Sequence, residues 1–129
     1  MPKAEGLTLP FDTEDAIRVD LLETFPYKGE TQKINYTTSE FSAVCPFSGL
    51  PDYGDLIIDY IPKDSIVELK SLKYYITSYR QVGIYQEHLT SRLCQDLWAL
   101  LDPQYLKITT IYNTRGGIDT TCSCEKSST

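Results

Sequence analysis

Residues 85–101 read YQEHLTSRLCQDLWALL, and an apolar side chain recurs at every fourth position of this stretch. The recurring residues are Tyr85, Leu89, Leu93, Leu97 and Leu101. A spacing of four places side chains on one face of a helix, so the stretch predicts an amphipathic helix that ends before Pro103. An apolar helix face must be buried against another layer, and the flanking sequence therefore needs to supply a sheet.

The sequence on both sides of this helix indicates strands. Residues 105–112 (YLKITTIY) alternate in character, a Gly-Gly pair then turns the chain, and residues 118–124 return as the second strand of a hairpin. Upstream, residues 34–44 (INYTTSEFSAV) are rich in the residue types of strands, and residues 56–61 (LIIDYI) form an apolar run of strand length. The sequence therefore predicts two pairs of strands, one before and one after the helical region.

A second helix is expected over residues 69–80, between the strand pairs. The order strand, strand, helix, helix, strand, strand predicts an α+β fold, in which an antiparallel sheet carries both helices on one face. The other face of the sheet needs cover, which favours assembly into a ring or barrel. We expect one domain over residues 34–124, an N-terminal arm over residues 1–33 and a polar tail over residues 125–129.

Composition narrows the possible partners. The 129 residues include 12 Lys and Arg against 18 Asp and Glu, a formal net charge of -6, and this acidic balance argues against direct binding of nucleic acid. A small-molecule partner is favoured instead. No stretch reaches the ~18 apolar residues of a membrane span, and residues 1–15 lack the apolar core of a secretory signal. The four cysteines are then expected to be free thiols in a cytoplasmic protein.

Cys45 is the candidate nucleophile. It lies between a predicted strand and the loop that contains Pro46 and Asp52. A partly accessible cysteine held as thiolate can attack an electrophilic carbon, and Asp52 can act beside it as general acid or base. A lone cysteine is more often a small buried hydrophobic residue, and both interpretations remain open from these residues alone.

Charged residues around the two predicted helices form a second candidate group. Lys70 and Lys73 are three positions apart and share a helix face, which suits a phosphate-bearing cofactor or simply a solvated surface. Glu68 and Glu87 open the two helices. Each carboxylate can either complement a helix dipole or hold a ring with amidine-like donors.

The remaining cysteines are expected to be structural. Cys122 and Cys124 lie two positions apart on a strand, and Cys94 lies on the helix. Together with His88, the single histidine, they do not provide the well-spaced ligands of a zinc site, so no metal is expected.

Four segments together resemble the QueF family, the NADPH-dependent 7-cyano-7-deazaguanine reductases of queuosine biosynthesis. They are CPFSGLPD at 45–52, ELKSLKYY at 68–75, SYR at 78–80 and NTRGG at 113–117. The resemblance runs from about Ile34 to Cys124 and is to the short, single-domain form. It implies a tunnelling fold over residues 34–124, shared with GTP cyclohydrolase, whose subunits assemble into stacked rings with a decamer expected.

The resemblance also implies roles for residues. Cys45 would add to the nitrile carbon of 7-cyano-7-deazaguanine as a covalent thioimide, and Asp52 would supply protons while two hydrides arrive from NADPH. The substrate base would be held by Val67, Glu68, Leu69, Gln86 and Glu87. Lys70 and Lys73 would face the cofactor phosphates, and Arg115 is a further candidate for this contact.

Gln86 departs from the family pattern, which places His immediately before the carboxylate at position 87. Glutamine forms hydrogen bonds but does not titrate near neutral pH. Two rival functions follow. One is the QueF-like amidinotransferase that adds ammonia to a base within tRNA. The other is a non-catalytic tunnelling-fold protein that binds a purine-like or pterin-like ligand.

Overall fold

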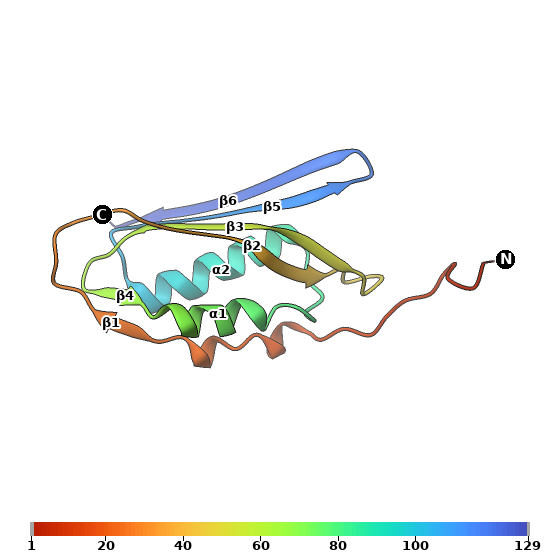
Figure 1. Cartoon of the computed structure of the whole chain (residues 1–129), viewed down its shortest axis with the longest axis horizontal. Coiled ribbons are helices and arrows are strands. Elements are labelled where there is room, and N and C mark those ends of the chain that lie inside the picture. Colours follow the sequence, from red (N-terminus) through yellow and green to blue (C-terminus); the bar gives the residue numbers. More distant parts are fainter. Residues whose placement is uncertain (1, 129) are drawn as a thin grey trace.

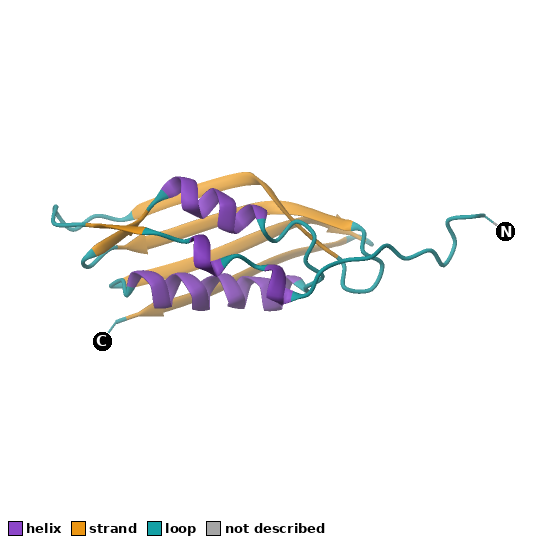
Figure 2. Ribbon diagram, turned by 90° about the horizontal axis from the view of Figure 1, so that it is seen from below, coloured by secondary structure: helices purple, strands orange, loops and turns teal. Residues whose placement is uncertain are grey.

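The computed structural model describes residues 2–128, which form an α+β fold with two antiparallel sheets (Figure 1). Along the chain the elements are η1 (Glu14–Ala16), η2 (Val19–Leu21), β1 (Thr24–Pro26), β2 (Ile34–Val44), β3 (Pro51–Ile61), β4 (Ser65–Val67), α1 (Leu69–Thr77), α2 (Gln86–Leu101), β5 (Tyr105–Arg115) and β6 (Ile118–Ser127). The main sheet has the order β2-β3-β5-β6, and β1 pairs with β4 in a small second sheet. Both helices cover one face of the main sheet, as predicted (Figure 2).

The predicted apolar face of α2 forms the centre of the core. Leu89, Leu93, Leu97 and Leu101 are all at most 3% exposed, whereas Tyr85 precedes the helix as its N-cap and is 59% exposed. Inward-facing residues of the central strands complete the core, among them Leu56, Ile58, Leu106 and Ile108. Burial of each such side chain contributes roughly 1.5–3 kcal/mol, so this face is what joins helix to sheet.

Several element boundaries differ from the sequence-based expectation, including the end of β5, which extends to Arg115 rather than to residue 112. The α-helix α1 ends at Thr77 rather than at residue 80, because Tyr79 and Arg80 donate to carbonyls three residues back and tighten the chain into a turn. Strand β3 begins at Pro51 rather than at residue 56. At Pro51 the strand pairs with β2 but not yet with β5, so the N–H that proline lacks is not required on the β5 side. Strand β6 continues to Ser127 opposite Tyr105, so residues 125–127 of the predicted polar tail belong to the sheet.

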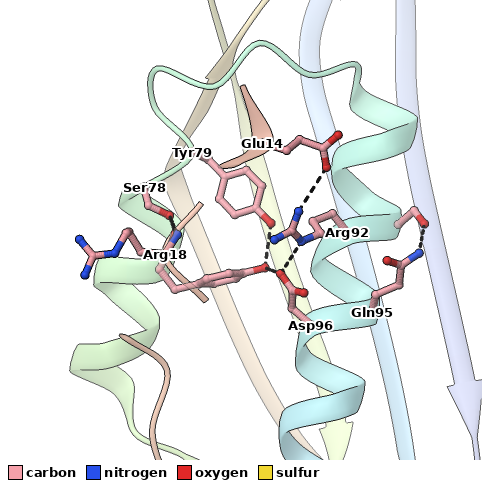
Figure 3. Close-up of polar contacts among 9 residues, drawn as sticks. Glu14, Arg18, Ser78, Tyr79, Arg92, Gln95 and Asp96 are labelled. Atoms are coloured by element: carbon pink, nitrogen blue, oxygen red, sulfur yellow. Dashed lines mark hydrogen bonds and ion pairs between the residues drawn. The ribbon is translucent and has the colours of Figure 1, made fainter. Parts of the chain in front are cut away.

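A polar cluster fastens the N-terminal arm and both helices together (Figure 3). The Tyr75 hydroxyl on α1 donates to the Asp96 carboxylate on α2 at 2.6 Å and shares a hydrogen bond with the Tyr79 hydroxyl at 2.7 Å. The Arg92 guanidinium also binds Asp96, at 2.8 Å, and reaches Glu14 of the arm at 3.3 Å. The hydroxyls of Tyr75 and Tyr79 therefore both have a partner in this cluster, and the arm is attached to the domain by an ion pair.

Within residues 2–128, no helix is both long and apolar enough to cross a membrane.

Candidate active site

A cavity of about 290 Å³ opens where β2 ends and α2 begins. Five of the residues singled out in the sequence line it: Cys45, Asp52, Gln86, Glu87 and Arg115. They come from the loop after β2, the start of β3, the first turn of α2 and the end of β5. The fold thus brings together residues that are up to 70 positions apart in the sequence.

The loop after β2 holds Cys45 half-buried at the rim of this cavity. Its backbone N–H donates to the Leu50 carbonyl at 2.9 Å, and the Gly49 N–H donates back to the Cys45 carbonyl at 2.9 Å. The loop closes tightly because Gly49 adopts a left-handed conformation with φ +75°. Hydrogen bonds from the Ser48 backbone and side chain lower the pKa of the Cys45 thiol, outweighing its partial burial and the nearby Asp52 carboxylate. The loop therefore favours the thiolate.

Asp52 is held in place by Arg115. The Asp52 carboxylate, 18% exposed, forms an ion pair with the Arg115 guanidinium, which also donates to the Pro51 carbonyl at 2.8 Å. Two strands thus fix the carboxylate at the start of β3, one residue beyond the pairing of Pro51 with Val44. Arg115 is engaged with the candidate proton carrier and lies in the same cavity as the thiol.

Gln86 ties the first turn of α2 to the β5–β6 hairpin. Its side-chain amide donates to the Thr120 carbonyl at 3.2 Å and to the Thr110 carbonyl at 3.4 Å. These bonds occupy the amide hydrogens and leave the side-chain oxygen as the group that can accept from a ligand. The neighbouring Glu87 is exposed at the cavity rim, where its carboxylate can receive hydrogen-bond donors.

Tyr112 also lines the cavity and was not predicted from the sequence as a site residue. Its hydroxyl oxygen is buried and has no hydrogen-bond partner among residues 2–128. Burial raises the pKa of Tyr112, and the Asp52 carboxylate adds to this effect, so the hydroxyl stays protonated as a donor. The alternation of side-chain directions along β5 could have indicated that Tyr112 points inward, because it lies on the same strand face as Leu106, Ile108 and Thr110.

The other predicted binding residues lie at the opposite end of the sheet. Val67 donates its N–H to the Tyr60 hydroxyl at 3.3 Å, and Tyr60 pairs with Ile34 at the start of β2. Cys45 follows the end of the same strand, and at about 3.3 Å per residue the strand separates the two groups by roughly 30 Å. Figure 1 shows β4 and the start of α1 at the end of the molecule away from the loop after β2. A single chain therefore does not unite them.

This distant group has its own arrangement around the start of α1. The Glu68 carboxylate caps the helix by accepting from the backbone N–H groups of Lys70 at 3.0 Å and Ser71 at 2.6 Å, and these bonds lower its pKa. Glu68 therefore lies at the start of a helix, as predicted, and its carboxylate caps that helix. Lys70 and Lys73 are exposed, and within residues 2–128 neither forms an ion pair. Leu69 and Lys73 line a groove of about 640 Å³ between α1 and β2.

The chain is similar to known proteins over most of its length. A family model described as "QueF-like protein" matches residues 51–129. A protein of Thermotoga petrophila named NADPH-dependent 7-cyano-7-deazaguanine reductase is 57% identical over 122 residues, which cover 94% of this chain and 89% of that protein. A protein of the same name from Caldicellulosiruptor bescii is 48% identical over 108 residues, 82% of each chain.

A solved structure supports the fold. The crystal structure of the archaeosine synthase QueF-Like in the apo form matches with a TM-score of 0.67, covering 80% of this chain and 99% of that one, at 22% identity. The family match extends over more than half of the sequence, and the relatives cover most of the rest. The chain belongs to the QueF family.

Proposed function

We propose that this protein is an NADPH-dependent 7-cyano-7-deazaguanine reductase that converts the nitrile of its substrate to an aminomethyl group, within queuosine biosynthesis. The observation that carries the proposal is the cavity in which the activated Cys45 thiol and the Asp52 carboxylate lie together. The 57% identity to a relative of that name supports the same substrate and cofactor. Four free cysteines suit the reducing cytoplasm, where we place the enzyme.

The chemistry follows from these two groups. The Cys45 sulfur forms a bond to the nitrile carbon while one carbon–nitrogen π bond breaks, and the thiol proton passes through Asp52 to the nitrogen, which gives a covalent thioimide. When bound, NADPH would supply one hydride per molecule, and two molecules would be used in succession. After the carbon has accepted the first hydride, Asp52 protonates the nitrogen and the sulfur departs as thiolate, which the Ser48 hydrogen bonds stabilise. The imine that remains accepts the second hydride at carbon, and a further proton, drawn from water through Asp52, completes the amine. Arg115 keeps the carboxylate in position through these steps.

Substrate recognition is assigned to both ends of the sheet. Glu87 and the Gln86 side-chain oxygen lie at the cavity and are placed to accept from the ring nitrogens. Val67, Glu68 and Leu69 are about 30 Å away in the same chain, so their contribution requires a second copy. Strands β2 and β6 are the outer strands of the main sheet and have open edges that a neighbouring copy can extend. We propose that copies join through these edges into tunnelling-fold rings, stacked as a decamer.

The cofactor is assigned to the start of α1. NADPH carries several phosphate charges. Lys70 and Lys73 are exposed and three positions apart on α1, and Lys73 lines the groove between α1 and β2. Their freedom from ion pairs within residues 2–128 leaves both ammonium groups available for phosphate oxygens. Arg115 already forms an ion pair with Asp52, so it is the weakest of the three candidates for contact with the cofactor phosphates.

The decisive experiment mixes the protein with 7-cyano-7-deazaguanine and NADPH and follows the cofactor absorbance. We expect consumption of two NADPH per substrate, its loss in Cys45→Ala, and its retention in Cys122→Ala, a matched control at another half-buried cysteine. Mass spectrometry of the intact protein distinguishes the rivals. A covalent adduct without NADPH consumption indicates the amidinotransferase chemistry, and absence of both adduct and consumption indicates a binding protein.

A further inference from the structure

The N-terminal arm passes directly over the loop that holds Cys45. The Leu9 N–H donates to the Ser48 carbonyl at 2.7 Å. The approach is so close that a Cβ placed on Gly49 would lie 2.2 Å from the Leu9 carbonyl oxygen. Figure 1 shows this arm reaching the molecule at the end where β2 finishes. The arm therefore packs on the residue whose hydrogen bonds stabilise the thiolate.

The same arm then joins the segment that leads into α2. Asp12 donates its N–H to the Gln81 carbonyl at 2.7 Å and accepts from the Gly83 N–H at 2.9 Å. Between these bonds the Phe11 ring lies against Gly83, where an added Cβ would be 2.2 Å from the ring carbon Cδ2. Residues 81–83 are thus held from one side by the arm.

On the other side, residues 82–84 pair with the end of β2. Val44 donates to the Val82 carbonyl at 3.0 Å and accepts from the Ile84 N–H at 3.2 Å. Val44 immediately precedes Cys45, and Ile84 is two residues before Gln86. The arm, the segment before α2 and the end of β2 therefore form one ladder of backbone hydrogen bonds, in which the arm is the outer segment. Cys45 follows directly after the β2 part of this ladder, and α2 begins shortly after the middle segment.

We propose that residues 9–12 of the arm are a positioning element for the active site, which hold the Cys45 loop and the approach to Gln86 in register with each other. The inference rests on the proposed function, because it concerns the nucleophile assigned there. Phe11 and Leu9 act through the backbone of other residues and do not touch the reacting atoms. Release of the arm frees Ser48 and weakens the hydrogen bonds that its backbone and hydroxyl make to the thiolate.

Gly83→Ala provides a specific way to displace the arm, since the Gly83 backbone is not in the left-handed region and alanine collides there mainly with the Phe11 ring. We expect Gly83→Ala to move the midpoint of the pH profile of Cys45 alkylation by iodoacetamide to higher pH. At a pH below the midpoint of the profile, a rise of one unit in the Cys45 pKa lowers the thiolate fraction about tenfold and raises its intrinsic nucleophilicity about threefold, so alkylation at that pH becomes about threefold slower.

The Phe11→Ala variant supplies the control. In the double variant Gly83→Ala with Phe11→Ala, the added methyl group meets no ring, and Cys45 reactivity should return to that of Phe11→Ala alone. Peptide mass spectrometry measures Cys45 separately from Cys122, whose reactivity should stay unchanged in all variants. An unchanged Cys45 profile in Gly83→Ala overturns the proposal. So does a double variant that reacts more slowly than Phe11→Ala alone, because the methyl group then acts on residues 81–84 without meeting the ring.

A second pair of variants covers the case in which Gly83→Ala does not fold. Leu9→Pro removes the N–H that binds Ser48, whereas Thr8→Pro removes one that has no backbone or side-chain acceptor within residues 2–128. A slower Cys45 reaction in Leu9→Pro than in Thr8→Pro supports the positioning role, and equal rates refute it. Alkylation needs neither substrate nor NADPH, so it reports on the arm even if Cys45 proves not to be the catalytic nucleophile.

Discussion

Removal of one hydroxyl group should have different effects on stability at Tyr75 and Tyr112, two tyrosines whose hydroxyl groups are buried. The Tyr112 hydroxyl has no hydrogen-bond partner within residues 2–128, whereas the Tyr75 hydroxyl has two partners, Tyr79 at 2.7 Å and Asp96 at 2.6 Å (Figure 3). An unsatisfied buried polar group costs about 1–3 kcal/mol of desolvation. The change Tyr112→Phe should therefore leave the free energy of unfolding unchanged or raise it by up to about 1 kcal/mol.

Tyr75→Phe removes the same atom but breaks two contacts and leaves the Asp96 carboxylate with only Arg92. A hydrogen bond to a charged group contributes about 1.5–3 kcal/mol, so a loss of about 2–3 kcal/mol is expected. Because ~1 kcal/mol corresponds to a Tm shift of about 3–5 °C at this chain length, Tyr75→Phe should melt about 6–15 °C below the parent protein.

Thermal and urea unfolding of both variants measure these differences in parallel with turnover. Tyr112→Phe should be as stable as the parent and yet show a fivefold to thirtyfold lower kcat/KM, roughly 1–2 kcal/mol, if the hydroxyl donates to the substrate. A Tyr112→Phe protein destabilised by more than about 1 kcal/mol would refute the reasoning, since it would show that the hydroxyl is satisfied in the free protein.

Three further perturbations test the cavity. Ser48→Ala removes one hydrogen bond that lowers the pKa of Cys45, so the thiolate forms at higher pH. Alkylation of Cys45, measured at a pH below the midpoint of its profile, should slow about twofold to threefold. Arg115→Gln leaves Asp52 without its ion-pair partner and should reduce kcat by about 10²-fold, measured as NADPH consumption, with little change in the urea midpoint because Arg115 is 57% exposed. Gln86→His introduces a group that titrates near pH 6.5, so the pH profile of kcat/KM should gain a new ionisation there if position 86 contacts the substrate.

Local patterns predicted the core elements but not the relation between distant parts of the site. The spacing of Leu89 to Leu101 specified the buried face of α2 because every fourth residue of a helix repeats the same direction. Cys45 and Asp52 are seven positions apart and meet because β2 and β3 pair across one short loop, which is also a local event. Their predicted proximity required only a turn between two strands.

Other features depended on tertiary contacts that leave little trace in the sequence. The arm reaches Ser48 and Gly83 through backbone hydrogen bonds, which any residue type can form, so residues 9–12 looked irregular. Similarly, Tyr112 resembled an ordinary strand residue until its neighbours were known. The distance between Cys45 and Glu68 could not be predicted from the sequence either. It follows from the length of β2 and from the packing of α1 beside the start of that strand.

The capping role of Glu68 is compatible with its proposed role in substrate recognition. A carboxylate offers about four lone-pair positions, and the backbone N–H groups of Lys70 and Ser71 occupy one on each oxygen. The cap therefore holds the group rigid while leaving acceptor capacity for donors of a purine-like ring. Rigidity matters here, because a fixed carboxylate loses little side-chain entropy when it binds. The same cap starts α1 at Leu69 and so sets Lys70 and Lys73 on one face, and the substrate and cofactor contacts proposed for this segment would both follow from a single helix start.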